Sequence, residues 1–146
     1  MYHRVLWWIK RDFRLFDNEA LVKAIASSKE VIPVFMFEPS LLGAEETSYF
    51  HVHAWWQALQ HVQQELQTRG SDLLYLYADL PYAFEYLSRY LPFEAVFSHQ
   101  ETGSNVTYAR DIRVKQWCDS QQVMWHEYRQ NGVVRGLQDR DSREAS

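Results

Sequence analysis

Residues 10–18, with the sequence KRDFRLFDN, carry five charged side chains directly after an apolar run. The run, residues 5–9 (VLWWI), predicts a buried strand. The charges would then lie where a first strand leads into a first helix, and this edge of an open α/β sheet is where ligands bind and domains dock. Charges at a strand end predict a site that holds and orients a ligand, with no bond-breaking group among them.

A second polar segment, residues 98–103 (SHQETG), follows the fourth predicted strand and precedes residues 108–111 (YARD). In a sheet of order 3-2-1-4-5, strands one and four are neighbours whose connections run to opposite faces, so residues 10–18 and 98–103 would flank one crevice. A competing interpretation is that the charged residues only form salt bridges at the sheet edge. It applies to Arg11, Asp12, Arg14, Glu101, Arg110 and Asp111.

The standard signatures of nucleotide and catalytic sites are absent from the sequence. It contains neither G-x-G-x-x-G after the first predicted strand nor G-x-x-x-x-G-K-[ST], which disfavours the usual NAD and nucleoside-triphosphate enzymes. His51, His53 and His61 lack the i, i+4 spacing that stacks metal ligands on a helix, so we expect no metal site. No Ser-His-Asp or nucleophile-elbow pattern is present, and we assign no catalytic residue.

The composition is that of a globular protein with one sizeable core. The chain has 146 residues, 47% of them hydrophobic and 23% charged, and a formal net charge of −4 disfavours a non-specific nucleic-acid surface. The 16% of aromatic residues either fill a bulky core or line a pocket for a flat ligand. The single cysteine, Cys118, predicts a packed thiol in a reducing compartment. Without a long apolar run, we expect a cytoplasmic protein with no membrane contact.

Strand and helix patterns alternate along the chain. Strands are predicted over 3–10, 31–37, 72–78, 94–98 and 123–128, and helices from residue 18 and over 48–69, 80–91 and 105–121. Asp17 is expected to cap the first helix, and residues 38–47 to form a loop. Strict alternation predicts right-handed crossovers and a parallel sheet. We expect a Rossmann-like, doubly wound sheet of five strands with helices on both faces, and we take its order to be 3-2-1-4-5. Residues 136–146 are polar without an apolar face, as in the start of a linker.

Several segments resemble the DNA photolyase/cryptochrome family. Residues 8–21 (WIKRDFRLFDNEAL) resemble its opening signature, and residues 31–39 (VIPVFMFEP) resemble its second strand. Weaker matches follow at residues 70–73, 108–111 and 130–134, so the resemblance covers roughly residues 3–141 in order. Two positions depart from the pattern, because Lys10 stands where the family often has Arg and Glu38 where it usually has Asp. Both keep the charge but change its reach.

The resemblance implies a function for the whole family member and a narrower one for this chain. Photolyases repair UV-induced pyrimidine dimers in DNA with a reduced flavin and blue light. In some members, the N-terminal α/β domain holds an antenna chromophore, which is a folate, a deazaflavin or a flavin. A separate helical domain binds FAD and DNA. Residues 1–135 would be the antenna domain, and residues 136–146 would be the start of the interdomain linker. FAD and damaged DNA would be bound only through the C-terminal helical domain, which is absent from this chain.

The resemblance also assigns chromophore-binding residues. Three parts of the chain would line the cleft. The end of the first strand would contribute Ile9, Lys10, Arg11, Asp12 and Phe13. The second strand and the helix after it would contribute Phe37, Glu38 and Phe50, and the segment after the fourth strand would contribute Glu101. Arg11 suits an anionic chromophore, while Asp12 and Glu101 accept hydrogen bonds from ring N–H groups. Two alternatives stay open, a blue-light-sensing cryptochrome and a Rossmann-like module that binds a nucleotide or a protein. Whether the whole protein is an enzyme depends on this choice, and the chain alone is expected to be inactive.

Overall fold

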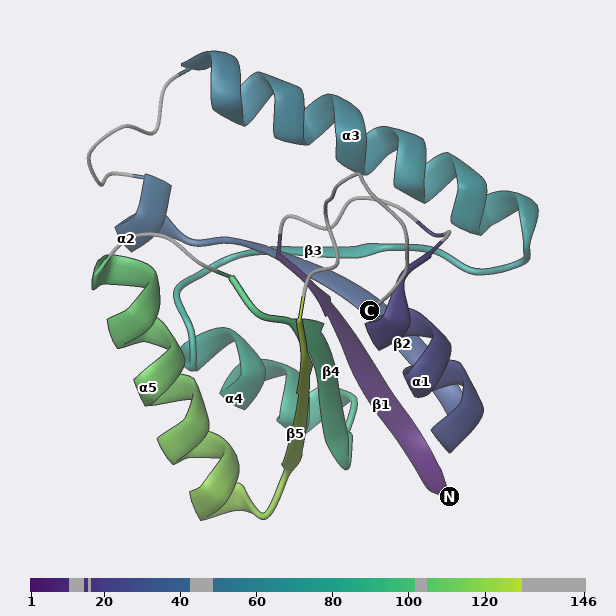
Figure 1. Ribbon diagram of the computed structural model, residues 1–146, viewed down its shortest axis with the longest axis vertical. Helices are drawn as coiled ribbons and strands as arrows, with labels where there is room; N and C mark the ends of the chain where they lie inside the picture. The colour runs from purple at the N-terminus through teal and green to yellow at the C-terminus, as the bar shows by residue number, and fades with distance from the viewer. Residues whose placement is uncertain (11–14, 16, 43–48, 102–104, 130–146) are drawn as a thin grey trace.

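A computed structural model describes most of the chain (Figure 1). It covers residues 1–10, 15, 17–42, 49–101 and 105–129, without the side chains of residues 49–52. Strands and helices alternate along the chain. They are β1 (Tyr2–Ile9), α1 (Glu19–Ser27), β2 (Ser28–Phe37), α2 (Pro39–Leu42), α3 (Tyr49–Thr68), β3 (Leu74–Tyr77), α4 (Tyr82–Tyr90), β4 (Ala95–His99), α5 (Asn105–Gln121) and β5 (Met124–Tyr128).

The five strands form one parallel sheet with β1 at its centre. Their order is β3-β2-β1-β4-β5, and every pairing between neighbours is parallel. The predicted fold class and strand order are therefore confirmed. The register pairs Ile9 with Phe35 on one side of β1 and Trp7 with Phe97 on the other, so β1, β2 and β4 end at the same edge of the sheet.

Both faces of the sheet are covered by helices. Alternate side chains of β1 point to opposite faces, and Val5, Trp7 and Ile9 belong to the core that also holds buried residues of α1 and α3. Leu6 and Trp8 belong to a second core, with α4 and α5. Burial on both faces explains why β1 is continuously apolar rather than alternating.

Two local expectations are wrong. Residues 39–42 form the short helix α2 within the segment expected to be a loop, and the backbone oxygen of Glu38 accepts hydrogen bonds from the amides of Leu41 and Leu42. The cap of α1 is Asn18 rather than Asp17, because the Asn18 side chain accepts from the Leu21 amide at 2.9 Å. Asp17 instead adopts a left-handed conformation with φ 53°, which aspartate tolerates better than most residues.

Asn18→Ala should lower the free energy of unfolding by about 1 kcal/mol, because it removes the acceptor for a buried amide at the start of α1. Asp17→Gly is the matched control, and it should leave stability unchanged or raise it slightly, since glycine adopts positive φ freely. Urea denaturation of both variants tests the assignment. A larger loss of unfolding free energy in Asp17→Gly than in Asn18→Ala would show that Asp17 is the helix cap.

Candidate functional site

A pocket that is open to solvent lies at the carboxyl ends of β1 and β2. One part of its lining is apolar and the other is charged. The apolar part comes from β1, β2, α2 and α3, and the charged part from residues just after β1, β2 and β4 and from α5. The lining residues are Trp8, Ile9, Phe35, Met36, Phe37, Leu41, Leu42 and Trp55, and Lys10, Glu38, Glu101 and Arg110.

The charged part of the pocket is organised around Arg110, whose side chain is only 3% exposed. Its Nη1 donates to Glu38 Oε1 at 2.6 Å, and its Nη2 donates to Glu101. Its Nε lies 2.9 Å from Asp111 Oδ1 but without the angle of a hydrogen bond, so it has no hydrogen-bond partner among the described residues. The guanidinium of α5 therefore ties the segment after β4 to the segment after β2.

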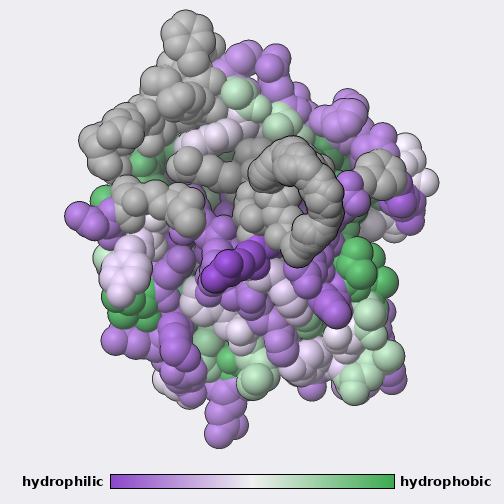
Figure 2. Space-filling view, in the orientation of Figure 1, coloured by the Kyte–Doolittle hydropathy of each residue, from purple (hydrophilic) through white to green (hydrophobic). Residues whose placement is uncertain are grey.

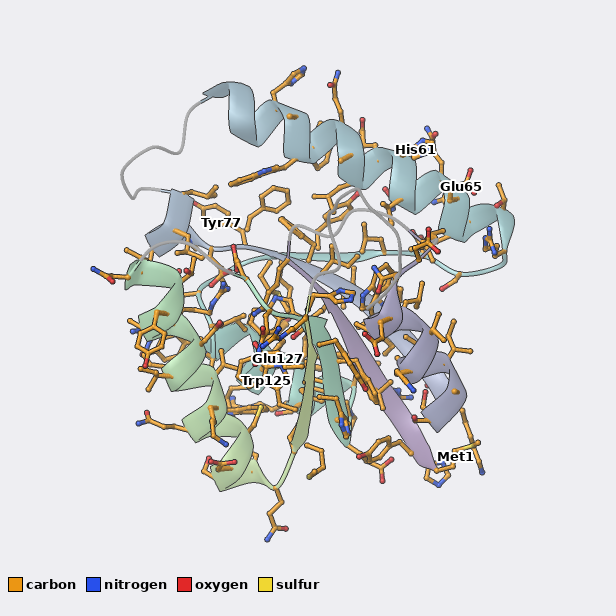
Figure 3. The ribbon with its side chains drawn as sticks, viewed as in Figure 1. Met1, His61, Glu65, Tyr77, Trp125 and Glu127 are labelled. Atoms are coloured by element: carbon orange, nitrogen blue, oxygen red, sulfur yellow. The ribbon has the colours of Figure 1, made fainter. Side chains whose placement is uncertain are left out.

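Lys10 brings a second buried cation to the same place. Its Nζ lies 3.4 Å from Asp111 Oδ2 and 3.8 Å from Glu127 Oε2. Glu127 and Trp125 extend together from β5 toward α5 (Figure 3), since residues two apart share a face of a strand. The Lys10 ammonium also lies over the rings of Trp8 and Trp125, 4.4 and 5.4 Å from their centroids. Burial lowers the pKa of Lys10, and Asp111 opposes that shift.

Glu38 is the most perturbed carboxyl group of the pocket. Burial raises its pKa to about 7, Arg110 opposes the shift, and the charge of Glu101 adds to it. Two carboxylates thus compete for one guanidinium in a site with little water. Near neutral pH, Glu38 can accept a hydrogen bond when ionised or donate one when protonated.

The structure brings together five of the nine predicted site residues. They line the pocket, and they are Ile9, Lys10, Phe37, Glu38 and Glu101. The predictions for residues 11–13, which are Arg11, Asp12 and Phe13, fall outside the described part of the chain, as does the side chain of Phe50 at the start of α3. The competing interpretation also holds in part, because Arg110 forms salt bridges with Glu101 and Asp111.

Sequence reasoning missed six apolar lining residues and the central place of Arg110. Trp8, Phe35 and Met36 looked like strand core, Trp55 like part of a helical stripe, and Leu41 and Leu42 like loop. Arg110 did leave a signal, because it occupies a position of the buried stripe of α5 together with Thr107, Val114 and Cys118. A charged residue at such a position needs a buried partner.

The arrangement suits the binding of a flat polar ring. Pockets for such ligands have mostly apolar walls and a few convergent polar groups. Phe37 and Trp55 offer aromatic surface, and Glu38 and Glu101 offer hydrogen-bond acceptors. Within the described residues, no cluster of His, Cys, Asp and Glu could hold a metal ion. Cys118 is buried away from the pocket lining, and burial raises its pKa to about 12, so its thiol is unsuited to nucleophilic chemistry.

The outer surface seen in Figure 2 adds no second candidate. Hydrophilic residues dominate this face, with apolar residues in small separate groups between them. No described helix combines the length and the hydropathy that crossing a membrane requires.

Comparison with known proteins gives a consistent set of similarities. The family described as DNA photolyase matches residues 5–140. A deoxyribodipyrimidine photo-lyase of Synechococcus is 35% identical over 97 residues, which cover 66% of this chain and 20% of that protein. A cryptochrome DASH of Solanum lycopersicum is 29% identical, covering 66% and 18%. The chain spans about a fifth of the length of these relatives.

The fold comparison agrees with the sequence comparison. The crystal structure of an archaeal photolyase from Sulfolobus tokodaii, which holds two FAD molecules, superposes with a TM-score of 0.76 at 25% identity. The match covers 86% of this chain and 29% of the archaeal one.

Raising the pH from about 4.5 to about 7 should destabilise the fold through Glu38. The pKa of this carboxyl is raised in the folded state, so the folded protein holds a proton that the unfolded chain releases in this window. Glu38→Gln should remove on the order of 2 kcal/mol of that pH dependence. Urea denaturation at several pH values measures it, with Glu65→Gln, on α3 outside the pocket (Figure 3), as the matched control. Equal slopes in wild type and Glu38→Gln would contradict the assignment.

Proposed function

Since the chain belongs to the DNA photolyase family and corresponds to its N-terminal α/β domain, we propose that its pocket binds a light-harvesting chromophore. The chromophore is a flat ring system of the folate, deazaflavin or flavin class. The domain would hold it for energy transfer to an FAD in a C-terminal helical domain of the full-length protein. In that protein, the transferred energy would drive the repair of pyrimidine dimers.

The observation that carries this proposal is the convergence of strand-end residues on one pocket. Ile9, Phe37 and Glu38 come from or follow the two central strands, and Glu101 follows β4. A conjugated ring can lie against the aromatic side chains while its N–H groups donate to the two glutamates. These groups bind and orient, which is the chemistry that light harvesting requires of the protein. The residues 11–13 that follow Lys10 are proposed to complete the site.

Rigidity supports the same role. Energy transfer depends on the distance and orientation between donor and acceptor rings, so a useful site must fix its ligand. Glu38 and Glu101 are both held by Arg110, which is itself buried in α5. A ligand that binds these carboxylates would therefore be held in a fixed orientation relative to the sheet edge.

A blue-light-sensing cryptochrome is the second candidate. It is favoured by the match to a cryptochrome DASH, which covers the same share of this chain as the match to the Synechococcus photo-lyase. Both candidates use the α/β domain in the same way and differ in what the flavin of the second domain does. A general nucleotide-binding module is disfavoured, because the sequence lacks both standard phosphate-binding loops.

The pocket should bind riboflavin, used here as a probe of the flavin class, with a 1:1 stoichiometry. Leu42→Trp should weaken binding at least about tenfold, because the larger ring fills a pocket that buries most of its ligand. Val22→Trp, at an exposed position on α1, is the matched control. Fluorescence titration measures both, and equal affinities in the two variants would place the bound flavin elsewhere.

The isolated chain should not split pyrimidine dimers in light, even with added reduced flavin, because the FAD and the damaged DNA are proposed to bind through the C-terminal helical domain. The assay irradiates dimer-containing DNA with the purified protein and follows the recovery of intact bases. A Synechococcus-type photolyase serves as the positive control. Dimer splitting by this chain alone would refute the division of roles between the two domains.

A further inference from the structure

Trp8 lies beside two buried cations at the wall of the pocket. It is only 1% exposed and belongs to the pocket lining. The Nζ atom of Lys10 lies 4.4 Å from the centroid of its ring, and the Cζ atom of Arg110 lies 4.9 Å from it. The side chains of both cations are 2–3% exposed, so little water screens their charge from the indole.

This arrangement has a consequence for any photoexcited ring that binds beside it. Indole is the most easily oxidised of the common side-chain rings, and an excited flavin or pterin is a strong one-electron oxidant. In contact, one electron would leave Trp8 and enter the ligand, forming an oxidised indole and a reduced ligand. The electron would then return, and the excitation would end as heat with no bond or proton transferred.

We propose that Lys10 and Arg110 shield Trp8 from this oxidation and so preserve the excitation for transfer. This inference rests on the proposed function. A cation over the face of an indole is attracted by its electron-rich ring. The attraction turns into repulsion when the ring loses an electron and becomes positive. Both charges therefore oppose the electron loss, and their burial limits the screening of their field by solvent.

Four carboxylates of the cluster pair with the two cations. Asp111 and Glu127 lie against the Lys10 ammonium, while Glu38 and Glu101 lie against the Arg110 guanidinium. They compensate the burial of the two cations and hold them in place. The cations are the charged groups found in contact with the Trp8 ring. They are positioning residues that act through Trp8.

The experiment tethers a flavin at the pocket, so that it does not depend on the affinity of a free ligand. Leu42→Cys is labelled with a maleimide-linked flavin, while the buried Cys118 is protected from labelling. Trp55→Phe is included throughout, which leaves Trp8 as the tryptophan among the described lining residues. The fluorescence lifetime of the flavin is then measured by time-resolved emission.

Lys10→Gln should shorten this lifetime about threefold or more, because it removes the nearer charge. Adding Trp8→Phe should restore it, which a purely structural role of Lys10 would not produce. Lys115→Gln, an exposed lysine of α5, is the matched control and should leave the lifetime unchanged. An unchanged lifetime in Lys10→Gln, or a shortening that Trp8→Phe does not reverse, would overturn the inference.

The variant Trp8→Phe with Lys10 intact tests the inference even if Lys10→Gln fails to fold. A shielded Trp8 contributes no quenching, so the lifetime should stay the same, and a rise of about threefold would overturn the inference. The proposed function fails separately, through the absence of free riboflavin binding in the untethered protein. The tethered measurement keeps its meaning in that case, because the flavin is held at the pocket by its linker.

Discussion

The buried guanidinium of Arg110 is the constraint on which the functional edge of this protein depends. A charge in the interior is tolerated only where partners compensate its lost hydration. Here the partners are Glu38 after β2 and Glu101 after β4, together with the neighbouring Asp111. Because the two glutamates come from opposite sides of the central strand, their contacts with one side chain of α5 fix the spacing of the strand ends.

This constraint also explains why a pocket exists at that edge. Apolar residues of β1, β2, α2 and α3 could close together over the strand ends if only hydrophobic burial acted on them. The buried charges keep part of the space polar, since their hydrogen-bonding capacity cannot be met by apolar neighbours. The pocket therefore has one apolar and one charged part, and Trp8 lies where the cations meet the aromatic core.

The parts of the fold that follow from hydrophobic periodicity could be predicted from the sequence, and those that depend on local geometry could not. Continuous apolar strands alternating with amphipathic helices predicted the parallel sheet, and the strand order was taken from the doubly wound class of fold. The helix cap could not be assigned in the same way, because Asp17 and Asn18 are both good capping residues and the direction of the entering chain decides between them. For the pocket, position at a strand end singled out Lys10 and Glu101, and the family resemblance added Glu38. Trp55 enters the pocket only through the packing of α3 across the sheet.

The salt-bridge and ligand-site interpretations of the charged residues are compatible, and their combination accounts for the chemistry of the pocket. An ionised carboxylate offers about four acceptor positions, and a contact with Arg110 uses only part of this capacity. Glu38 and Glu101 can thus hold the guanidinium and still accept from a ligand. Burial raises the pKa of Glu38, and the neighbouring charge of Glu101 adds to this shift while Arg110 opposes it. A ligand that adds a donor would relieve the competition between the two carboxylates. Binding would then stabilise the network that shapes the pocket, so the same residues would order the sheet edge and orient its ligand.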